Sequence, residues 1–117
     1  MLFYCKEDFY TRSAKSRKLS RKSEKECALM MKQGDATARE KIIISYLPAV
    51  AAYVRKMPAR MQTYALICRF VAALEKAVDT FDFLQDNEAF LHRLSFVLRK
   101  ESVSHIAEYG VLFEVEK

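Results

Sequence analysis

The sequence has 117 residues, of which 51% are hydrophobic and 30% charged, and this is enough for one domain with a modest core. It contains only 2 glycines and 2 prolines, which excludes a many-stranded sheet because such a sheet needs these residues in its turns. Helix-favouring residues are plentiful, so we predict an all-α fold, a compact bundle of about four to five helices. The net charge is +5, and it is unevenly placed along the chain.

The cysteines and the hydropathy pattern indicate the cellular compartment. Cys5, Cys27 and Cys68 are odd in number and widely spaced, which indicates neither a disulfide framework nor a zinc site. No run of about 18 apolar residues is present, and the basic N-terminal residues lack the apolar stretch of a secretory signal. We therefore expect a soluble cytoplasmic protein that makes no membrane contact.

The positive charge is concentrated near the N-terminus. Residues 1–34 contain 9 Lys and Arg against 4 Asp and Glu, whereas residues 35–117 contain 11 of each. A short Ser-rich stretch holds most of the excess, in the side chains of Arg12, Lys15, Arg17, Lys18, Arg21, Lys22 and Lys25. Such a cluster either neutralises nucleic-acid phosphates or forms a solvated, mobile arm. We predict a flexible basic arm over residues 1–19, with docking of its aromatic side chains on the domain left open.

A helical domain is predicted over residues 20–110, and its first helix covers about residues 20–33. Ser23 and Glu26 have the spacing of a capping box at the helix start. Cys27, Met30 and Met31 follow on one face, and Gly34 supplies a left-handed stop.

The second helical segment begins at Asp35, which accepts hydrogen bonds from free backbone N–H groups. A continuous buried stripe follows at helical spacing, formed by Ile43, Leu47, Val50, Val54 and Met57. Pro48 lies inside this stripe and removes a helical hydrogen bond, so we expect a kink there or two helices that meet. Pro58 ends the segment.

The third helical segment, from about Thr63 to Thr80, carries the widest apolar face and is predicted to be the most buried. Asp86 or Asn87 can cap the next helix, whose inward side chains are predicted to be Phe90, Leu91, Leu94, Val97 and Leu98. Ser102 is expected to start a further short helix that Gly110 stops. Residues 111–117 are predicted to be a C-terminal tail.

The sequence offers few groups for catalysis, and we predict no enzyme and no cofactor. Gly34 and Gly110 stand alone, so no glycine-rich loop cradles a phosphate. His92 and His105 lack cysteine or carboxylate partners at ligand spacing, which argues against a metal site. Asp79 and Asp82 are more simply helix caps or solvated charges than an acid–base pair.

Two stretches resemble the second conserved region of bacterial RNA polymerase sigma factors. Residues 33–57 contain the family's Gly-Asp-x-x-Ala-Arg helix start, and residues 66–100 contain its Leu-x-x-Ala-Val-x-x-Phe-Asp helix end. The matching positions are Gly34, Asp35, Ala38, Arg39, Ile42 and Ile43, then Ala73, Leu74, Ala77, Val78, Phe81 and Asp82. By this resemblance, Phe81 and Asp82 form the turn between a polymerase-binding helix and a DNA-melting helix.

The resemblance also implies which residues contact partners. The positions that contact the polymerase beta-prime subunit in the family are occupied here by Ala65, Cys68, Arg69, Val71 and Glu75. The family's acidic and amide side chains are absent there, and Arg69 reverses a charge. The DNA-binding positions carry Arg93, Phe96, Val97, Arg99 and Lys100, with Phe96 as the side chain that can stack on a base. Simple packing of Phe90, Phe96 and Leu98 is the alternative.

The resemblance implies a transcription-initiation protein that binds the RNA polymerase core, promoter DNA, or both. One alternative is a helical adaptor that keeps the sigma-like fold, has lost promoter melting and binds a different protein through an apolar surface of Leu66, Phe70 and Val71. Another is a nucleic-acid tether that acts through the basic arm. Residues 104–117 are too few for a helix-turn-helix domain, so a second polypeptide that supplies a promoter-reading domain is a further implied partner.

Overall fold

The computed structural model describes the backbone of residues 3–84 and 89–115, and the side chains of residues 3–84 and 89–108. Its elements are all helical, which confirms the predicted all-α fold. They are α1 (Lys6–Lys15), α2 (Arg21–Lys32), α3 (Ala36–Ser45), α4 (Leu47–Arg55), the 3-10 helix η1 (Ala59–Met61), α5 (Tyr64–Thr80) and α6 (Phe90–Val115).

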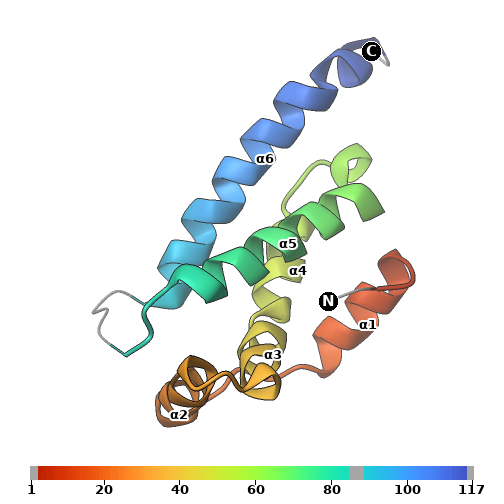
Figure 1. The fold of residues 1–117 in the computed structure, drawn as a ribbon. Coiled ribbons are helices and arrows are strands. Elements are labelled where there is room, and N and C mark those ends of the chain that lie inside the picture. Colours follow the sequence, from red (N-terminus) through yellow and green to blue (C-terminus); the bar gives the residue numbers. More distant parts are fainter. Residues whose placement is uncertain (1–2, 85–88, 116–117) are drawn as a thin grey trace.

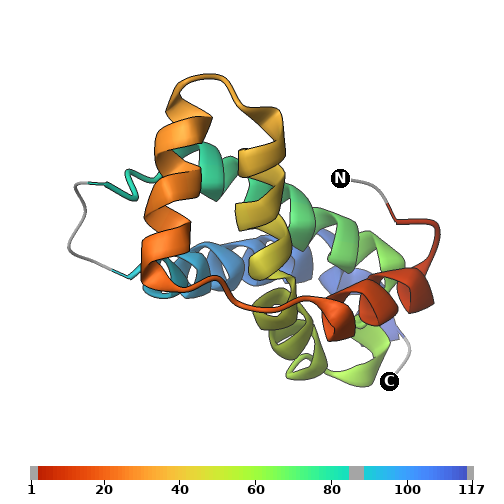
Figure 2. The same cartoon turned by 90° about the horizontal axis from the view of Figure 1, so that it is seen from below.

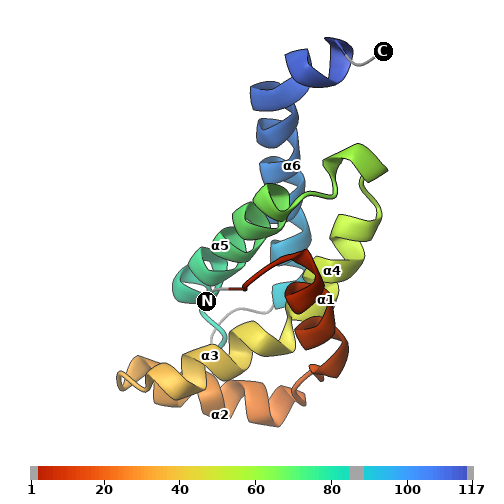
Figure 3. The same ribbon diagram turned by 90° about the vertical axis from the view of Figure 1, so that its right-hand side faces the viewer.

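The helices form an elongated body of 50 × 27 × 21 Å. α6 runs along α5, and its C-terminal end extends beyond the other helices (Figure 1). α2 and α3 lie side by side as an antiparallel pair (Figure 2), and α1 packs on α4 and on the start of α5 (Figure 3).

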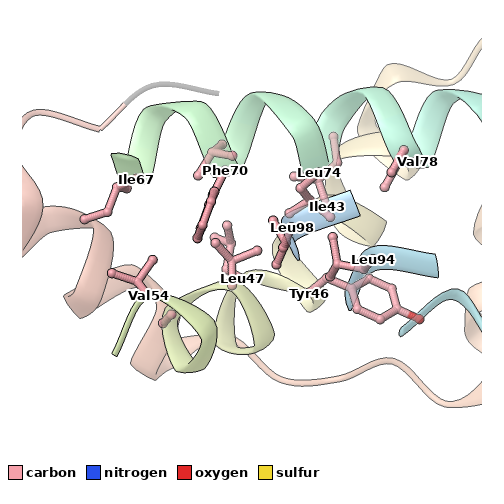
Figure 4. Packing of buried hydrophobic residues seen from close by; sticks show 14 of the residues in the cluster. Ile43, Tyr46, Leu47, Val54, Ile67, Phe70, Leu74, Val78, Leu94 and Leu98 are labelled. Carbon is pink, nitrogen blue, oxygen red and sulfur yellow. The ribbon is translucent and has the colours of Figure 1, made fainter. Parts of the chain in front are cut away.

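α5 provides the centre of the core, as its apolar pattern predicts. Its buried side chains are Leu66, Ile67, Phe70, Val71, Ala73, Leu74, Ala77 and Val78. Figure 4 shows Phe70 and Leu74 facing Leu47 of α4 and Leu98 of α6. Burial of such side chains contributes about 1.5–3 kcal/mol each, so this contact between helices supplies much of the driving force for folding.

The helices α2, α3 and α4 begin and end close to the residues predicted from the sequence. Gly34 has a φ of +93°, the left-handed conformation expected after a helix, and Asp35 Oδ1 accepts from the N–H groups of Thr37 and Ala38 at 2.9 and 3.1 Å. α3 ends at Ser45 and α4 begins at Leu47, so Pro48 lies in the first turn of a new helix, where its missing N–H costs nothing. The predicted stripe is buried from Ile43 to Val54, and its last member, Met57, is half-buried.

The joint between α5 and α6 is built from aromatic rings. Phe81 lies 4.8 Å from Phe83 and 5.1 Å from Phe90 between ring centroids, and all three rings are buried. Asp82 Oδ1 accepts from the N–H of Leu84 at 3.1 Å. Phe81 therefore fills the core at the joint, and Asp82 satisfies a backbone donor there. The predicted caps Asp86 and Asn87 lie outside the described residues.

The flexible arm is the largest correction to the sequence prediction. Residues 6–15 form α1, in which Phe9 is 0% exposed, and Phe3 packs edge-to-face on it with ring centroids 5.3 Å apart. The spaced aromatic side chains bury apolar area on α4 and α5, and this outweighs the local preference of a basic, Ser-rich stretch for solvent. The folded unit therefore begins well before residue 20.

Two details of α2 also differ from the prediction. The cap is Ser20 rather than Ser23, because the Ser20 side chain accepts from the N–H of Ser23 at 3.1 Å. Ala28 is the buried residue of α2, while Met30 is exposed and Cys27 and Met31 are half-buried.

α6 is one helix where two were expected. Ser102 does not start a helix, since its Oγ donates to the carbonyl of Arg99 at 2.8 Å inside α6. The helix continues through Gly110 to Val115, so most of the expected tail, residues 111–117, is helical. Phe90, Leu94 and Leu98 face inward as predicted and Val97 is half-buried, whereas Leu91 is exposed.

Candidate nucleic-acid interface

A groove of about 560 Å³ lies between the second half of α5 and the first half of α6. Ala73 and Ala77 form part of the α5 wall, and their small side chains leave room between the two helices. The polar lining comes from Lys76 and Thr80 of α5 and from His92, Arg93, Lys100, Glu101 and Ser104 of α6.

The groove is positively charged. Lys76 and Lys100 are exposed on opposite walls, and the Arg93 guanidinium lies 5.8 Å from the centroid of the Phe81 ring. This cation–π contact holds Arg93 at the mouth near the α5–α6 joint. Glu101 is the acidic group of the lining, and its carboxylate binds the guanidinium of Arg69 at 2.7 Å.

Phe96 is the exposed aromatic side chain of this groove. Its ring is 60% exposed, and it lies one helical turn from both Arg93 and Lys100 on the same face of α6. The alternative in which Phe90, Phe96 and Leu98 all pack is correct for Phe90 and Leu98 and wrong for Phe96. An exposed ring between cations can stack on a nucleobase while the cations contact phosphates.

Four of the five residues at the implied DNA-binding positions meet at this groove. Arg93, Phe96, Val97 and Lys100 line it, although Val97 is half-buried and also packs on the core. Arg99 is exposed on α6 but is not part of the lining.

The implied polymerase-binding positions do not form one surface. Ala65 and Cys68 are exposed on the outward side of α5, whereas Val71 is buried in the core. Glu75 lies 3.9 Å from Arg39 of α3. The apolar surface of Leu66, Phe70 and Val71 that the adaptor alternative requires is also buried, which corrects that expectation.

Arg69 links α5 to α6. Its guanidinium contacts Glu101 at 2.7 Å and Glu108 at 2.8 Å. The hydrogen bond from Arg69 lowers the pKa of Glu108, and the same carboxylates, Glu108 first, raise the pKa of Arg69. His105 is buried nearby, and its pKa is lowered by burial and then by the charge of Arg69. The positive charge of Arg69, which is opposite to the charge that the resemblance implies at this position, is thus paired with carboxylates of α6 inside the fold.

Asp79 has a structural role as well. Its carboxylate receives two hydrogen bonds from Arg39, at 2.6 and 2.9 Å, which lower its pKa. This contact joins the start of α3 to the end of α5, and Asp82 instead caps the joint. The two carboxylates serve different helices and do not form an acid–base pair.

The basic residues near the N-terminus divide into two groups. Arg12 is half-buried with its guanidinium 4.8 Å from the centroid of the Phe3 ring, so it stabilises the docked N-terminal segment. The exposed group consists of Lys15, Arg17, Lys18, Arg21, Lys22 and Lys25. Lys18 and Arg21 border a smaller cavity of about 250 Å³, whose wall includes Tyr46, Phe81 and Phe90.

Sequence reasoning missed Lys76, Thr80 and His92 as lining residues of the groove. Lys76 and Thr80 are four residues apart and therefore share a face of α5, a signal that is visible in the sequence. Whether these residues line the groove depends on which face of α5 lies beside α6. The spacing of residues within α5 does not predict how the two helices pack.

Residues 3–84 and 89–108, whose side chains the structure describes, contain no group of three or more His, Cys, Asp and Glu side chains placed to hold a metal ion. In the same part of the chain, no helix combines the length and apolar character needed to cross a bilayer. A scan of protein-family models and searches of curated proteins and solved structures found no match to this chain.

Proposed function

We propose that this chain is a sigma factor-like transcription protein that acts in the cytoplasm and binds the RNA polymerase core and single-stranded promoter DNA. The observation that carries the proposal is Phe96, exposed in a cation-lined groove on the helix that resembles the family's DNA-melting helix. The joint of Phe81 and Asp82 between α5 and α6 supports it, because the resemblance implies a turn at these residues.

In this proposal, the groove binds a displaced DNA strand. Lys76, Arg93 and Lys100 neutralise its phosphates, and Phe96 stacks on one unpaired base. The outward side of α5, with Ala65 and Cys68 exposed, is the side that meets the polymerase. Its small side chains make that contact chiefly apolar, in place of the family's acidic and amide contacts.

The test of the proposal is the substitution Phe96→Ala. Loss of one base–aromatic stack costs about 1–3 kcal/mol, so affinity for a short single-stranded oligonucleotide should fall roughly five- to hundred-fold. Fluorescence anisotropy at a fixed, moderate salt concentration measures the change. Because the ring is 60% exposed, the unfolding free energy should stay close to that of the wild type.

Val103→Ala is the matched control, since Val103 is also an exposed apolar residue of α6 but lies outside the groove lining. It should leave DNA affinity unchanged. If Lys18→Gln with Arg21→Gln removes binding while Phe96→Ala does not, the basic segment is the nucleic-acid site instead. Failure of the wild-type chain to co-elute with core polymerase would remove the polymerase half of the proposal.

A helical adaptor is the second candidate function. Val103 and Ile106 are exposed on the second half of α6, and exposed apolar side chains on one helix suit a protein partner. This candidate predicts that the chain binds neither single-stranded DNA nor core polymerase, which separates it from the first.

A further inference from the structure

The residues just before α1 are attached to the start of α5. The Tyr64 hydroxyl donates to the carbonyl of Phe3, and the Lys6 amine donates to the carbonyl of Gln62 at 3.1 Å. The first turns of α1 and α5 accordingly lie side by side in Figures 1 and 3. Two hydrogen bonds therefore flank Cys5 on both sides and fix it next to α5.

Cys68 lies on the same face of α5 as Tyr64, one helical turn further along. Both Cys5 and Cys68 are exposed, whereas Cys27 is half-buried on α2. The pKa of Tyr64 is raised, first by a hydrogen bond with Cys68, then by burial, and then by charge on Cys68 and Cys5. The hydrogen bond to the Phe3 carbonyl places the Tyr64 hydroxyl beside the segment that contains Cys5, and Cys68 lies one helical turn from Tyr64, although the two cysteines are far apart in the sequence.

We propose that Cys5 and Cys68 are a modification site, a thiol pair that a peroxide oxidises to an intramolecular disulfide. The thiolate of one cysteine attacks a peroxide oxygen; an S–O bond forms, the O–O bond breaks, and water leaves after protonation. The second thiolate then attacks the sulfenic sulfur; the S–S bond forms, the S–O bond breaks, and a second water leaves. Two thiols are oxidised and one peroxide is reduced.

The position of Cys5 suits this reaction. Cys5 precedes the first residue of α1, so adjusting its backbone to disulfide geometry does not break a helix. The bond would fasten the N-terminal segment to the outward side of α5, beside Ala65. This inference does not rest on the proposed function, because it uses only contacts between the N-terminal segment and α5.

The experiment treats the full chain with hydrogen peroxide, alkylates the remaining thiols, and maps tryptic peptides by mass spectrometry. We expect the Cys5 peptide linked to the Cys68 peptide in the monomer fraction, with Cys27 alkylated. Reduction should reverse the link. The oxidised chain should also have a higher Tm than the reduced one, because the closed loop restricts the unfolded state.

Cys27→Ser is the control variant and should form the same link, whereas Cys5→Ser and Cys68→Ser should lose it. Tyr64→Phe should slow the reaction several-fold, since it removes the hydrogen bond to the Phe3 carbonyl. A disulfide through Cys27, a link only between two chains, or complete alkylation of Cys5 and Cys68 after peroxide would each overturn the proposal.

Discussion

The meaning of a single charged residue in this protein depends on its neighbours in space. Arg69 occupies a position at which the implied family carries an acidic or amide side chain, yet two carboxylates of α6 surround its guanidinium. Arg69 is thus a cross-helix contact, and its charge is unavailable for repelling a partner. Glu75, six residues later on α5, is likewise drawn to Arg39 of α3.

Arg69→Glu should destabilise the fold by about 1–3 kcal/mol, because it places three carboxylates together between α5 and α6. Urea unfolding at pH 7 measures the loss. In the wild type the Glu108 pKa lies below 4.5, so the pair stabilises the fold above that pH and its contribution is lost as the pH falls through the lowered pKa. In the variant, acid instead relieves repulsion, so the gap between the two proteins should narrow below about pH 4.5.

Arg99→Glu is the control for this charge reversal, because Arg99 is exposed on α6. Its effect should stay within about 0.5 kcal/mol. Equal losses in the two variants, or a gap that stays constant with pH, would show that the Arg69 contacts do not stabilise the α5–α6 pair.

Individual side chains were predictable where periodicity decides their burial. The inward positions of Ile43, Leu47 and Leu74 follow from spacing alone, and the structure buries all three. Val71 was assigned to an outward contact by resemblance, but the apolar face of α5 is wide enough to include it in the core. Phe96 could not be decided in advance, because its exposure depends on where the small residues Ala73 and Ala77 open the α5–α6 groove.

At the scale of elements, the boundaries at Asp35 and Thr80 were predicted correctly, whereas the start at Ser102 and the stop at Gly110 were not. The start of a helix can be predicted from a capping side chain in the local sequence. At Asp35, one carboxylate oxygen accepts hydrogen bonds from two backbone N–H groups. The full length of α6 was not predicted, because Ser102 resembles the start of a helix and Gly110 resembles its end when only the neighbouring sequence is considered. Within the helix the Ser102 hydroxyl is satisfied by the carbonyl of Arg99, so no break is required there.

Asp35→Ala should reduce the unfolding free energy by about 0.5–2 kcal/mol, because the first turn of α3 loses the acceptor for two N–H groups. Asp35→Ser should recover most of that loss, since a hydroxyl can accept in the same place. Chemical denaturation of the three proteins measures the series. If alanine and serine are equally destabilising, the cap is not the reason for the loss.

The whole molecule differs most from its sequence prediction at the N-terminus. Basic charge and serines indicated an arm, while Phe3 and Phe9 were scattered without helical repetition. Their burial requires surfaces of α4 and α5 that are distant in the sequence, so no local pattern could show it. The same docking attaches the segment that contains Cys5 to the start of α5, which the cysteine spacing did not indicate.

If α1 is an integral part of the fold, its buried ring should matter for the stability of the entire chain. Phe9 is 0% exposed, so Phe9→Ala should cost about 3–5 kcal/mol and lower the Tm of the single unfolding transition. Tyr4→Ala is the matched control, because Tyr4 is an aromatic residue of the same segment that is 97% exposed. Its loss should be no more than about 0.5 kcal/mol. Circular dichroism during urea titration measures the unfolding free energy of both variants. Small and equal losses of this free energy would show that residues 3–15 are a mobile arm.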